Sequence, residues 1–144
     1  LKAATEMLLD EGLENVFARH RRIAEGVRRA VDTWGLHLCA MRPELYSDTV
    51  SAIRVPDNFD ANRIIAHALN VYGVSFGTGL GELAGKVFRI GHLGSLTEVM
   101  ALSGLATAEM AMADVGLPIR LGSGVAAAQE YYRLGAANTR QKAA

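Results

Sequence analysis

Arg89 is the residue whose chemistry stands out, because it lies inside an apolar segment that has the pattern of a β-strand. Its neighbours Phe88 and Ile90 are hydrophobic, and glycines flank the segment on both sides. Since side chains alternate across a strand, Phe88 and Ile90 are expected on one face and Arg89 on the other. A guanidinium group in such a position can bind a carboxylate through two parallel hydrogen bonds. It can equally be a surface arginine paired with a nearby Asp or Glu, and the residues alone favour neither interpretation.

Seven of the 15 glycines lie within residues 73–94, around this strand. Such a density allows turns with positive φ and lets a ligand approach the backbone, which makes Gly79, Leu80 and Gly81 candidates for a substrate-binding loop. The loop also resembles two nucleotide-binding motifs, but neither fits. The dinucleotide motif has to open a helix, whereas this segment leads into the strand at Val87, and a P-loop needs Ser or Thr where Val87 stands. A connection between two strands is the better interpretation.

The other chemically active side chains are scattered along the sequence. His92 follows the strand and can approach a ligand there, but the four histidines lack the spacing of a metal site, so no metal is expected. Lys86 lies in the loop, where nothing indicates the buried pocket that lowers a lysine pKa for Schiff-base chemistry. Cys39 is the only cysteine, which excludes an internal disulfide and a thiolate zinc site. A reducing, cytoplasmic location is expected.

The composition argues against nucleic acid and membrane partners. The 15 basic and 15 acidic residues cancel. The arginine-rich stretch at residues 19–29 has the acidic residues Glu14, Glu25 and Asp32 within or close to it, as on a solvated helix face. No run of consecutive apolar residues approaches the roughly 20 that cross a bilayer. Half of the 144 residues are hydrophobic, which is enough for a globular core.

The order of predicted elements indicates an α+β fold, a small and mostly antiparallel sheet with helices on one face. Hydrophobic spacing and turn residues predict helices at residues 1–10, 13–34, 61–72, 96–116 and 125–134, and strands at residues 36–39, 49–55, 74–76 and 87–90. Asp60 is expected to cap the third helix, and Ser95 with Glu98 has the pattern of a capping box for the fourth. The inner face of the third helix is expected to carry Ile64, Ile65, Ala68 and Leu69. Because the chain begins inside a helix without a capping residue, we expect it to be part of a longer protein.

Two segments, GTGLGELAGKVFRIGHLGSLTE and DEGLENVFARHRRIAEGVRRAVDTWGLHL, resemble the C-terminal part of class V aminotransferases. These are fold-type I enzymes that depend on pyridoxal 5'-phosphate, and the resemblance is closest to bacterial serine–glyoxylate aminotransferases. It implies that residues 1–35 form the helical end of the large domain or the interdomain helix. Residues 36–135 then form the C-terminal small α+β domain, and residues 136–144 form a flexible tail.

The resemblance also implies a role for Arg89, which would bind the α-carboxylate of the substrate. The Schiff-base lysine and the groups that hold the cofactor are expected before Leu1, so we expect no catalytic and no cofactor-binding residue within this segment. The implied reaction transfers an amino group from serine, or alanine, to glyoxylate, and gives hydroxypyruvate and glycine. The implied partners are a small amino acid, a 2-oxo acid and a second copy of the enzyme in a homodimer.

Three alternatives accompany this interpretation. Alanine–glyoxylate and ureidoglycine–glyoxylate aminotransferases share the resemblance. A free-standing amino-acid-binding regulatory domain has a similar order of helices and strands, so the fold by itself does not exclude it. The helical segment at residues 1–34 favours the enzyme, because a compact regulatory domain does not need it.

Overall fold

The structure is a computed structural model, which describes the backbone of residues 1–142 and the side chains up to Gly135. The chain begins with two helices, α1 (Lys2–Glu11) and the long α2 (Leu13–Thr33). Gly12 between them has a φ of 83°, a conformation that favours glycine, which explains why the helical segment breaks at this residue. Gly35, with a φ of 69°, follows the end of α2 and turns the chain toward the sheet.

Four short strands form one antiparallel sheet. They are β1 (His37–Leu38), β2 (Val50–Arg54), β3 (Gly77–Thr78) and β4 (Val87–Gly91), and they lie in the order β1-β2-β4-β3. The short 3₁₀ helices η1 (Pro43–Leu45) and η2 (Gly81–Leu83) lie in the β1–β2 and β3–β4 connections. The register places Ala52 of β2 and Gly77 of β3 opposite Arg89 of β4, one on each side.

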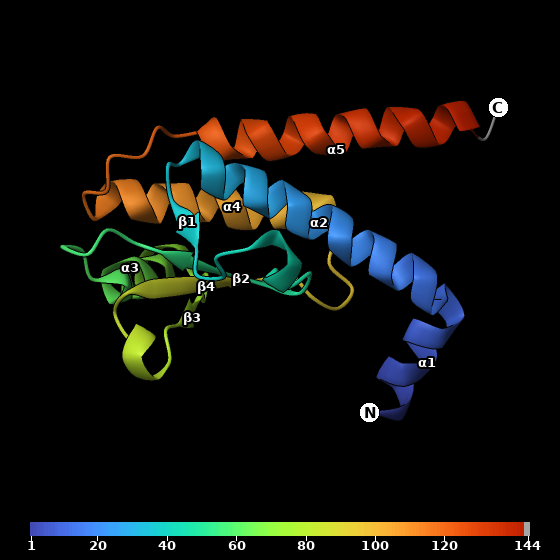
Figure 1. Cartoon of the computed structure of the whole chain (residues 1–144), viewed down its shortest axis with the longest axis horizontal. Helices are drawn as coiled ribbons and strands as arrows, with labels where there is room; N and C mark the ends of the chain where they lie inside the picture. The colour runs from blue at the N-terminus through green and yellow to red at the C-terminus, as the bar shows by residue number, and fades with distance from the viewer. Residues whose placement is uncertain (143–144) are drawn as a thin grey trace.

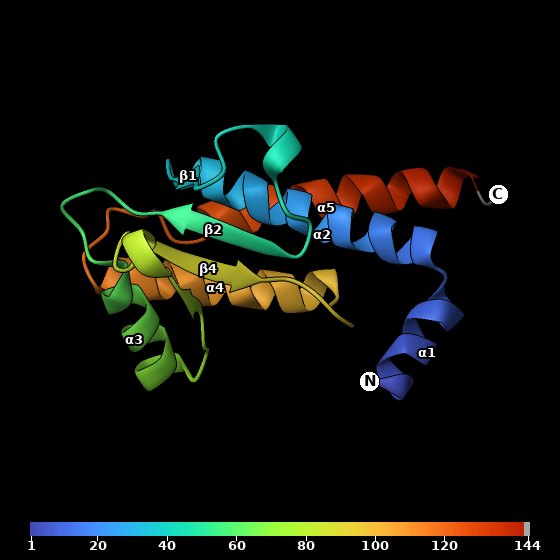
Figure 2. The same ribbon diagram turned by 60° about the horizontal axis from the view of Figure 1, so that its bottom comes forward.

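Three further helices complete the fold: α3 (Ala61–Tyr72), α4 (Glu98–Asp114) and α5 (Ser123–Lys142). The long helices α2, α4 and α5 lie together on one side of the sheet, and the turn that carries η2 lies on the other (Figure 1). Figure 2 shows α2 and α4 running behind the paired strands β2 and β4. The predicted α+β architecture with helices on one face is confirmed.

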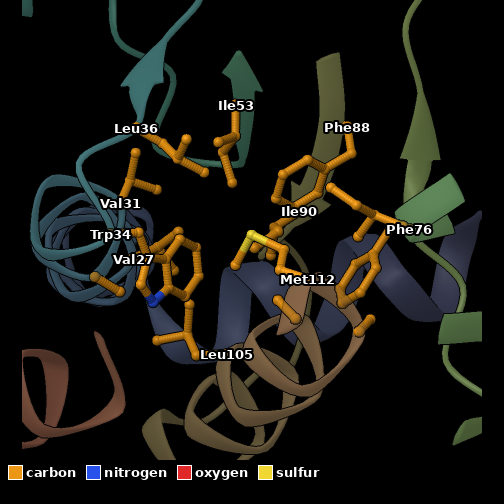
Figure 3. Close-up of a cluster of buried hydrophobic side chains, with 14 of the residues drawn as sticks. Val27, Val31, Trp34, Leu36, Ile53, Phe76, Phe88, Ile90, Leu105 and Met112 are labelled. Atoms are coloured by element: carbon orange, nitrogen blue, oxygen red, sulfur yellow. The ribbon is translucent and has the colours of Figure 1, made fainter. Parts of the chain in front are cut away.

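A hydrophobic core fills the space between the sheet and the helices. Phe88 and Ile90 of β4 point toward Met112 of α4, and Phe76 packs beside them (Figure 3). The rings of Phe76 and Phe88 meet edge-on, with centroids 6.0 Å apart. Burial of one large side chain of this kind contributes about 1.5–3 kcal/mol, so the alternating residues of β4 hold the sheet against the helices.

A buried carboxylate fastens the start of α5. Glu109 of α4 accepts hydrogen bonds from the indole Nε1 of Trp34, at 2.9 Å, and from the backbone amides of Gly122, Gly124 and Val125. Gly124 lies so close to the indole that a Cβ there would be 2.4 Å from Trp34 Nε1. These contacts satisfy free amides at the first turn of α5 and tie that helix to α2 and α4.

The structure corrects several of the predicted boundaries. β3 is Gly77–Thr78 rather than residues 74–76, because the amide of Val74 bonds to the carbonyl of Ala68 and closes the end of α3. Leu69 is 51% exposed instead of facing the core. The last helix continues past residue 134 to Lys142, so residues 136–142 of the expected tail are helical, and residues 143–144 lie outside the described part.

The predicted capping box at the start of α4 is wrong. Thr97, not Ser95, is the N-cap, and its Oγ1 accepts a hydrogen bond from the amide of Met100 at 3.3 Å. The carboxylate of Glu98 bonds to Arg22 of α2 at 2.8 Å instead of returning to the cap. By contrast, Asp60 caps α3 as predicted, through the amide of Asn62 at 2.9 Å.

Candidate functional site

The candidate site lies on the face of the sheet that none of the long helices α2, α4 and α5 covers (Figure 1). Along β4, Phe88 and Ile90 are buried against the helices, whereas Arg89 between them faces the opposite side and is half-buried. The strand alternation that the sequence predicts around Arg89 is therefore confirmed. The residues opposite Arg89 on the neighbouring strands, Ala52 and Gly77, are small, so nothing on this row of the sheet covers the guanidinium group.

The backbone of β3 holds the guanidinium group of Arg89 in place. Its Nε donates a hydrogen bond of 2.8 Å to the carbonyl oxygen of Thr78. No hydrogen bond from either Nη to a described residue is present in the structure. With Nε occupied by the backbone, the two Nη groups are the donors that remain for a planar, two-oxygen acceptor.

Arg89 differs from the other half-buried arginines of the described chain in having no acidic partner. Arg19 binds Glu11 at 2.6 Å, Arg22 binds Glu98 at 2.8 Å, and Arg28 binds Asp48 at 2.6 Å. Arg89 forms no ion pair with any Asp or Glu whose side chain the structure describes. The alternative in which Arg89 is a surface arginine paired within this sheet is therefore not supported by the described residues.

The predicted loop residues directly follow Thr78, the residue to which Arg89 bonds. Gly79 follows Thr78, whose carbonyl accepts the bond from Arg89, and a Cβ on Gly79 would lie 2.0 Å from the carbonyl oxygen of Leu83. Gly81 has a φ of 55°, and the side chain of Leu80 between the two glycines is 67% exposed. Glycine is thus required at position 79 to close the turn, which keeps the loop at Arg89. A role of Gly79, Leu80 and Gly81 in binding substrate stays a prediction.

The structure does not bring His92 into this site. His92 is buried on the helix side of the sheet, where Nε2 lies 2.9 Å from Ser51 Oγ and Nδ1 lies 3.2 Å from the carbonyl oxygen of Asp48. Burial lowers the pKa of this imidazole below its usual value, so the neutral form is favoured. The ring donates from Nδ1 to the Asp48 carbonyl and accepts the hydroxyl of Ser51 at Nε2, which is a structural role.

The described residues do not supply a site for pyridoxal phosphate. Such a site needs a lysine amine inside a pocket, and Lys86 is exposed on an open surface hollow that it shares with Asp57 and Asp60. Within the described part of the chain, no group of three or more His, Cys, Asp or Glu side chains is placed to hold a metal ion. None of the described helices is both long and apolar enough to cross a membrane.

Two features around Arg89 were missed by the sequence analysis. Gly77 and the carbonyl oxygen of Thr78 form the surface against which the guanidinium group lies. The register of β3 against β4 would have revealed them. It cannot be read from the sequence, because β3 has only two residues, Gly77 and Thr78, and these show no alternation of apolar and polar side chains. The chemistry of the site comes from Arg89, but its orientation comes from a neighbouring strand.

Comparison with known proteins places these features in a family context. No family model matches the sequence. The chain is 73% identical over 144 residues to an L-aspartate–glyoxylate aminotransferase of Paracoccus denitrificans, and 58% identical over 132 residues to a serine–glyoxylate aminotransferase of Hyphomicrobium methylovorum. These matches cover 100% and 92% of the chain but only 36% and 33% of the relatives, so the chain spans about a third of their length.

Solved structures give the same result for the fold. A pyridoxamine–pyruvate aminotransferase from Mesorhizobium loti matches with a TM-score of 0.84 and 34% identity, over 90% of this chain and 33% of its own. A ureidoglycine–glyoxylate aminotransferase from Bacillus subtilis matches with a TM-score of 0.83 and 27% identity, over 89% of this chain and 33% of its own. In sequence and in fold, this chain therefore corresponds to the C-terminal part of the class V, fold-type I aminotransferases.

Proposed function

We propose that this chain is the C-terminal part of a pyridoxal-phosphate-dependent aminotransferase that uses glyoxylate, and that Arg89 binds the carboxylate of its substrates. The observation that carries the proposal is the half-buried guanidinium group of Arg89, which has no acidic partner in the described chain. An arginine in this state can bind an incoming carboxylate without first breaking an internal ion pair.

One arginine serves both halves of such a reaction. An amino acid and a 2-oxo acid differ at the reacting carbon but share the carboxylate next to it, so the same group can orient both. The bond from Nε to the Thr78 carbonyl fixes the plane of the guanidinium group, and the two Nη groups then hold the carboxylate at a defined angle. Holding a reactant in the right geometry is a large part of what a protein contributes to catalysis.

The cofactor is proposed to be held by the rest of the protein, since the residues described here do not fit it. Pyridoxal phosphate acts as an electron sink for the transfer of the amino group. The relatives are about three times as long as the part that this chain matches, which leaves room for a complete cofactor site. We also propose that the enzyme is a homodimer, as the family resemblance implies, and that it is cytoplasmic, as expected for a chain with a single cysteine. Sedimentation of the active enzyme as a monomer would contradict the dimer.

Two amino donors are candidates. Serine, which would give hydroxypyruvate and glycine, is the donor implied by the sequence resemblance and named for the Hyphomicrobium relative. L-Aspartate is the donor named for the Paracoccus relative, which matches the whole chain at 73% identity. Both relatives are named for glyoxylate as the amino acceptor. The proposal therefore names one acceptor, glyoxylate, but leaves serine and L-aspartate as alternative donors.

The test is to assay the full-length protein, supplied with pyridoxal phosphate, for glycine formation from glyoxylate. We expect the specificity constant, kcat/KM, to be higher for serine or L-aspartate as donor than for alanine. A clear preference for alanine or for ureidoglycine would assign the protein to one of those sister activities. Binding of amino acids without any glycine formation would contradict the enzyme and favour a regulatory domain.

A further inference from the structure

We propose that Gly77 is a positioning residue for Arg89, because its lack of a side chain leaves the space in which the guanidinium group lies. The inference rests on the proposed role of Arg89 as the carboxylate-binding group. Gly77 is directly opposite Arg89 in the β3–β4 register, so the two residues present their side-chain positions on the same face of the sheet. The side chain of Arg89 crosses over Gly77 to reach the carbonyl oxygen of Thr78.

The distances show how closely the two residues meet. A Cβ built on Gly77 would lie 3.1 Å from Arg89 Cβ, 3.1 Å from Nε and 3.4 Å from Cζ. All three nearest atoms belong to Arg89, and none belongs to the backbone or to another side chain. A methyl group at this position would therefore press first on the arginine side chain, which would have to shift by a few tenths of an ångström.

The backbone does not explain the glycine. Gly77 is absent from the residues with positive φ, so its conformation is one that any amino acid adopts. It lies in a strand, where glycine is less favourable than a β-branched residue. Gly79, two residues further on, is different, since a Cβ there would meet the backbone of Leu83 at 2.0 Å. Gly79 is required by the turn, whereas the tightest contacts of a side chain at position 77 would be with Arg89.

The position of Arg89 has a chemical consequence for the ligand. When Nε is bonded to Thr78, a carboxylate has to approach the guanidinium group end-on, through Nη1 and Nη2. A side chain at position 77 would weaken that bond and tilt the group, so that the carboxylate is held at the wrong angle. Gly77 thus acts through Arg89 and does not itself contact the substrate.

The experiment replaces Gly77 by alanine and by valine in the full-length enzyme. We expect Gly77→Ala to lower kcat/KM only a few-fold, because contacts of 3.1 Å require a small shift of the arginine. Gly77→Val adds two more methyl groups and should cost more, up to on the order of the 100-fold loss that a misplacement of about 1 Å can cause. The loss should affect the amino donor and glyoxylate alike and should include a rise in KM for both. The melting temperature of Gly77→Val should not fall, since valine is favourable in a strand.

Two further variants make the result specific. Gly104→Ala is the matched control, because Gly104 lies in α4, a Cβ added there would meet no atom within 4 Å, and the kinetics should be unchanged. In the Arg89→Lys background, Gly77→Val should have little additional effect, since its target is already lost. A loss of equal size in that background would show that Gly77 does not act through Arg89, and would overturn the inference.

The remaining outcomes separate this inference from the proposed function. If the wild-type enzyme is active and Arg89→Ala is not, but the Gly77 variants have normal kcat/KM, only the inference about Gly77 is wrong. If Gly77→Val loses activity in proportion to a lower melting temperature, with normal KM values, Gly77 is merely structural. If the wild-type protein transfers no amino group to glyoxylate, the proposed function and the positioning role are both overturned.

Discussion

Arg89 and Glu109 are ionisable residues of the same small fold, but they differ in how many of their hydrogen-bonding groups are used within it. Glu109 is 2% exposed, and its carboxylate accepts hydrogen bonds from Trp34 Nε1 and from three backbone amides at the start of α5. Arg89 is half-buried on the other side of the molecule, and a single hydrogen bond from Nε orients it. Both carboxylate oxygens of Glu109 accept hydrogen bonds from within the fold, whereas the two Nη groups of Arg89 remain available to a ligand.

This difference indicates that Glu109 contributes to stability, whereas Arg89 is available for function. A buried charge with all its hydrogen bonds made stabilises one arrangement of the chain, and its removal leaves several donors without partners. An oriented charge with unused donors contributes little to the fold and is available to a ligand. The same distinction applies to the two sides of β4, because Phe88 and Ile90 fill the core while Arg89 faces away from it.

The largest effect is expected when Arg89 is replaced. Arg89→Ala should lower kcat/KM roughly 30-fold to a few thousand-fold, because the carboxylate loses its partner in a partly desolvated site. This corresponds to a loss of about 2–5 kcal/mol of transition-state stabilisation. Arg89→Lys should retain only part of the binding, since an ammonium group is a point charge without the planar match. Steady-state kinetics with the amino donor and with glyoxylate measure this loss. Near-normal constants for both substrates would show that Arg89 is not the carboxylate site.

Replacement of Glu109 should show the opposite pattern. Glu109→Ala leaves the indole of Trp34 and the amides at the start of α5 unsatisfied, at about 1–3 kcal/mol for each buried group. We expect the amides of Gly124 and Val125 to exchange with deuterium about 100-fold faster, while KM is unchanged. Glu130→Gln, at an exposed position on α5, is the matched control. Unchanged exchange in Glu109→Ala would contradict the role of Glu109 as the anchor of α5.

A smaller effect is expected from His92, whose titration should make the free energy of unfolding depend on pH. Because burial lowers its pKa in the folded protein, the unfolded chain binds more protons once the pH falls below about 6.5. The free energy of unfolding should therefore decrease as the pH falls through this region, by up to about 1.4 kcal/mol per pH unit. His92→Gln removes the titrating group, and its stability should vary less between pH 7 and pH 5. Identical pH profiles for the two proteins would contradict the buried, neutral His92.

Local patterns in the sequence predict the longer elements well, and for physical reasons. The regular spacing of Ile23, Val27 and Val31 predicts α2, and these residues are buried in it. The alternation around Arg89 likewise predicts which face of β4 it occupies. Asp60 caps α3 because the partner of its side chain, the amide of Asn62, is only two residues away.

The features that sequence analysis missed depend on contacts between distant residues. Glu98 does not complete a capping box because Arg22 of α2, far away in the sequence, binds its carboxylate. β3 is too short to have a period, so its position is set by pairing with β4. The positioning of Arg89 by Gly77 and Thr78 depends on that pairing. The chemistry of the candidate site could therefore be predicted from one residue, but its geometry could not.

The central claim is that the free Nη groups of Arg89 hold the substrate carboxylate, and a crystal structure of the full-length enzyme with a bound, unreactive substrate analogue tests it most directly. We expect two carboxylate oxygens of the analogue within hydrogen-bonding distance of Nη1 and Nη2, with Nε still bonded to the carbonyl oxygen of Thr78. An Arg89 bound instead to an Asp or Glu of the enzyme, with the carboxylate of the analogue elsewhere, would contradict the claim.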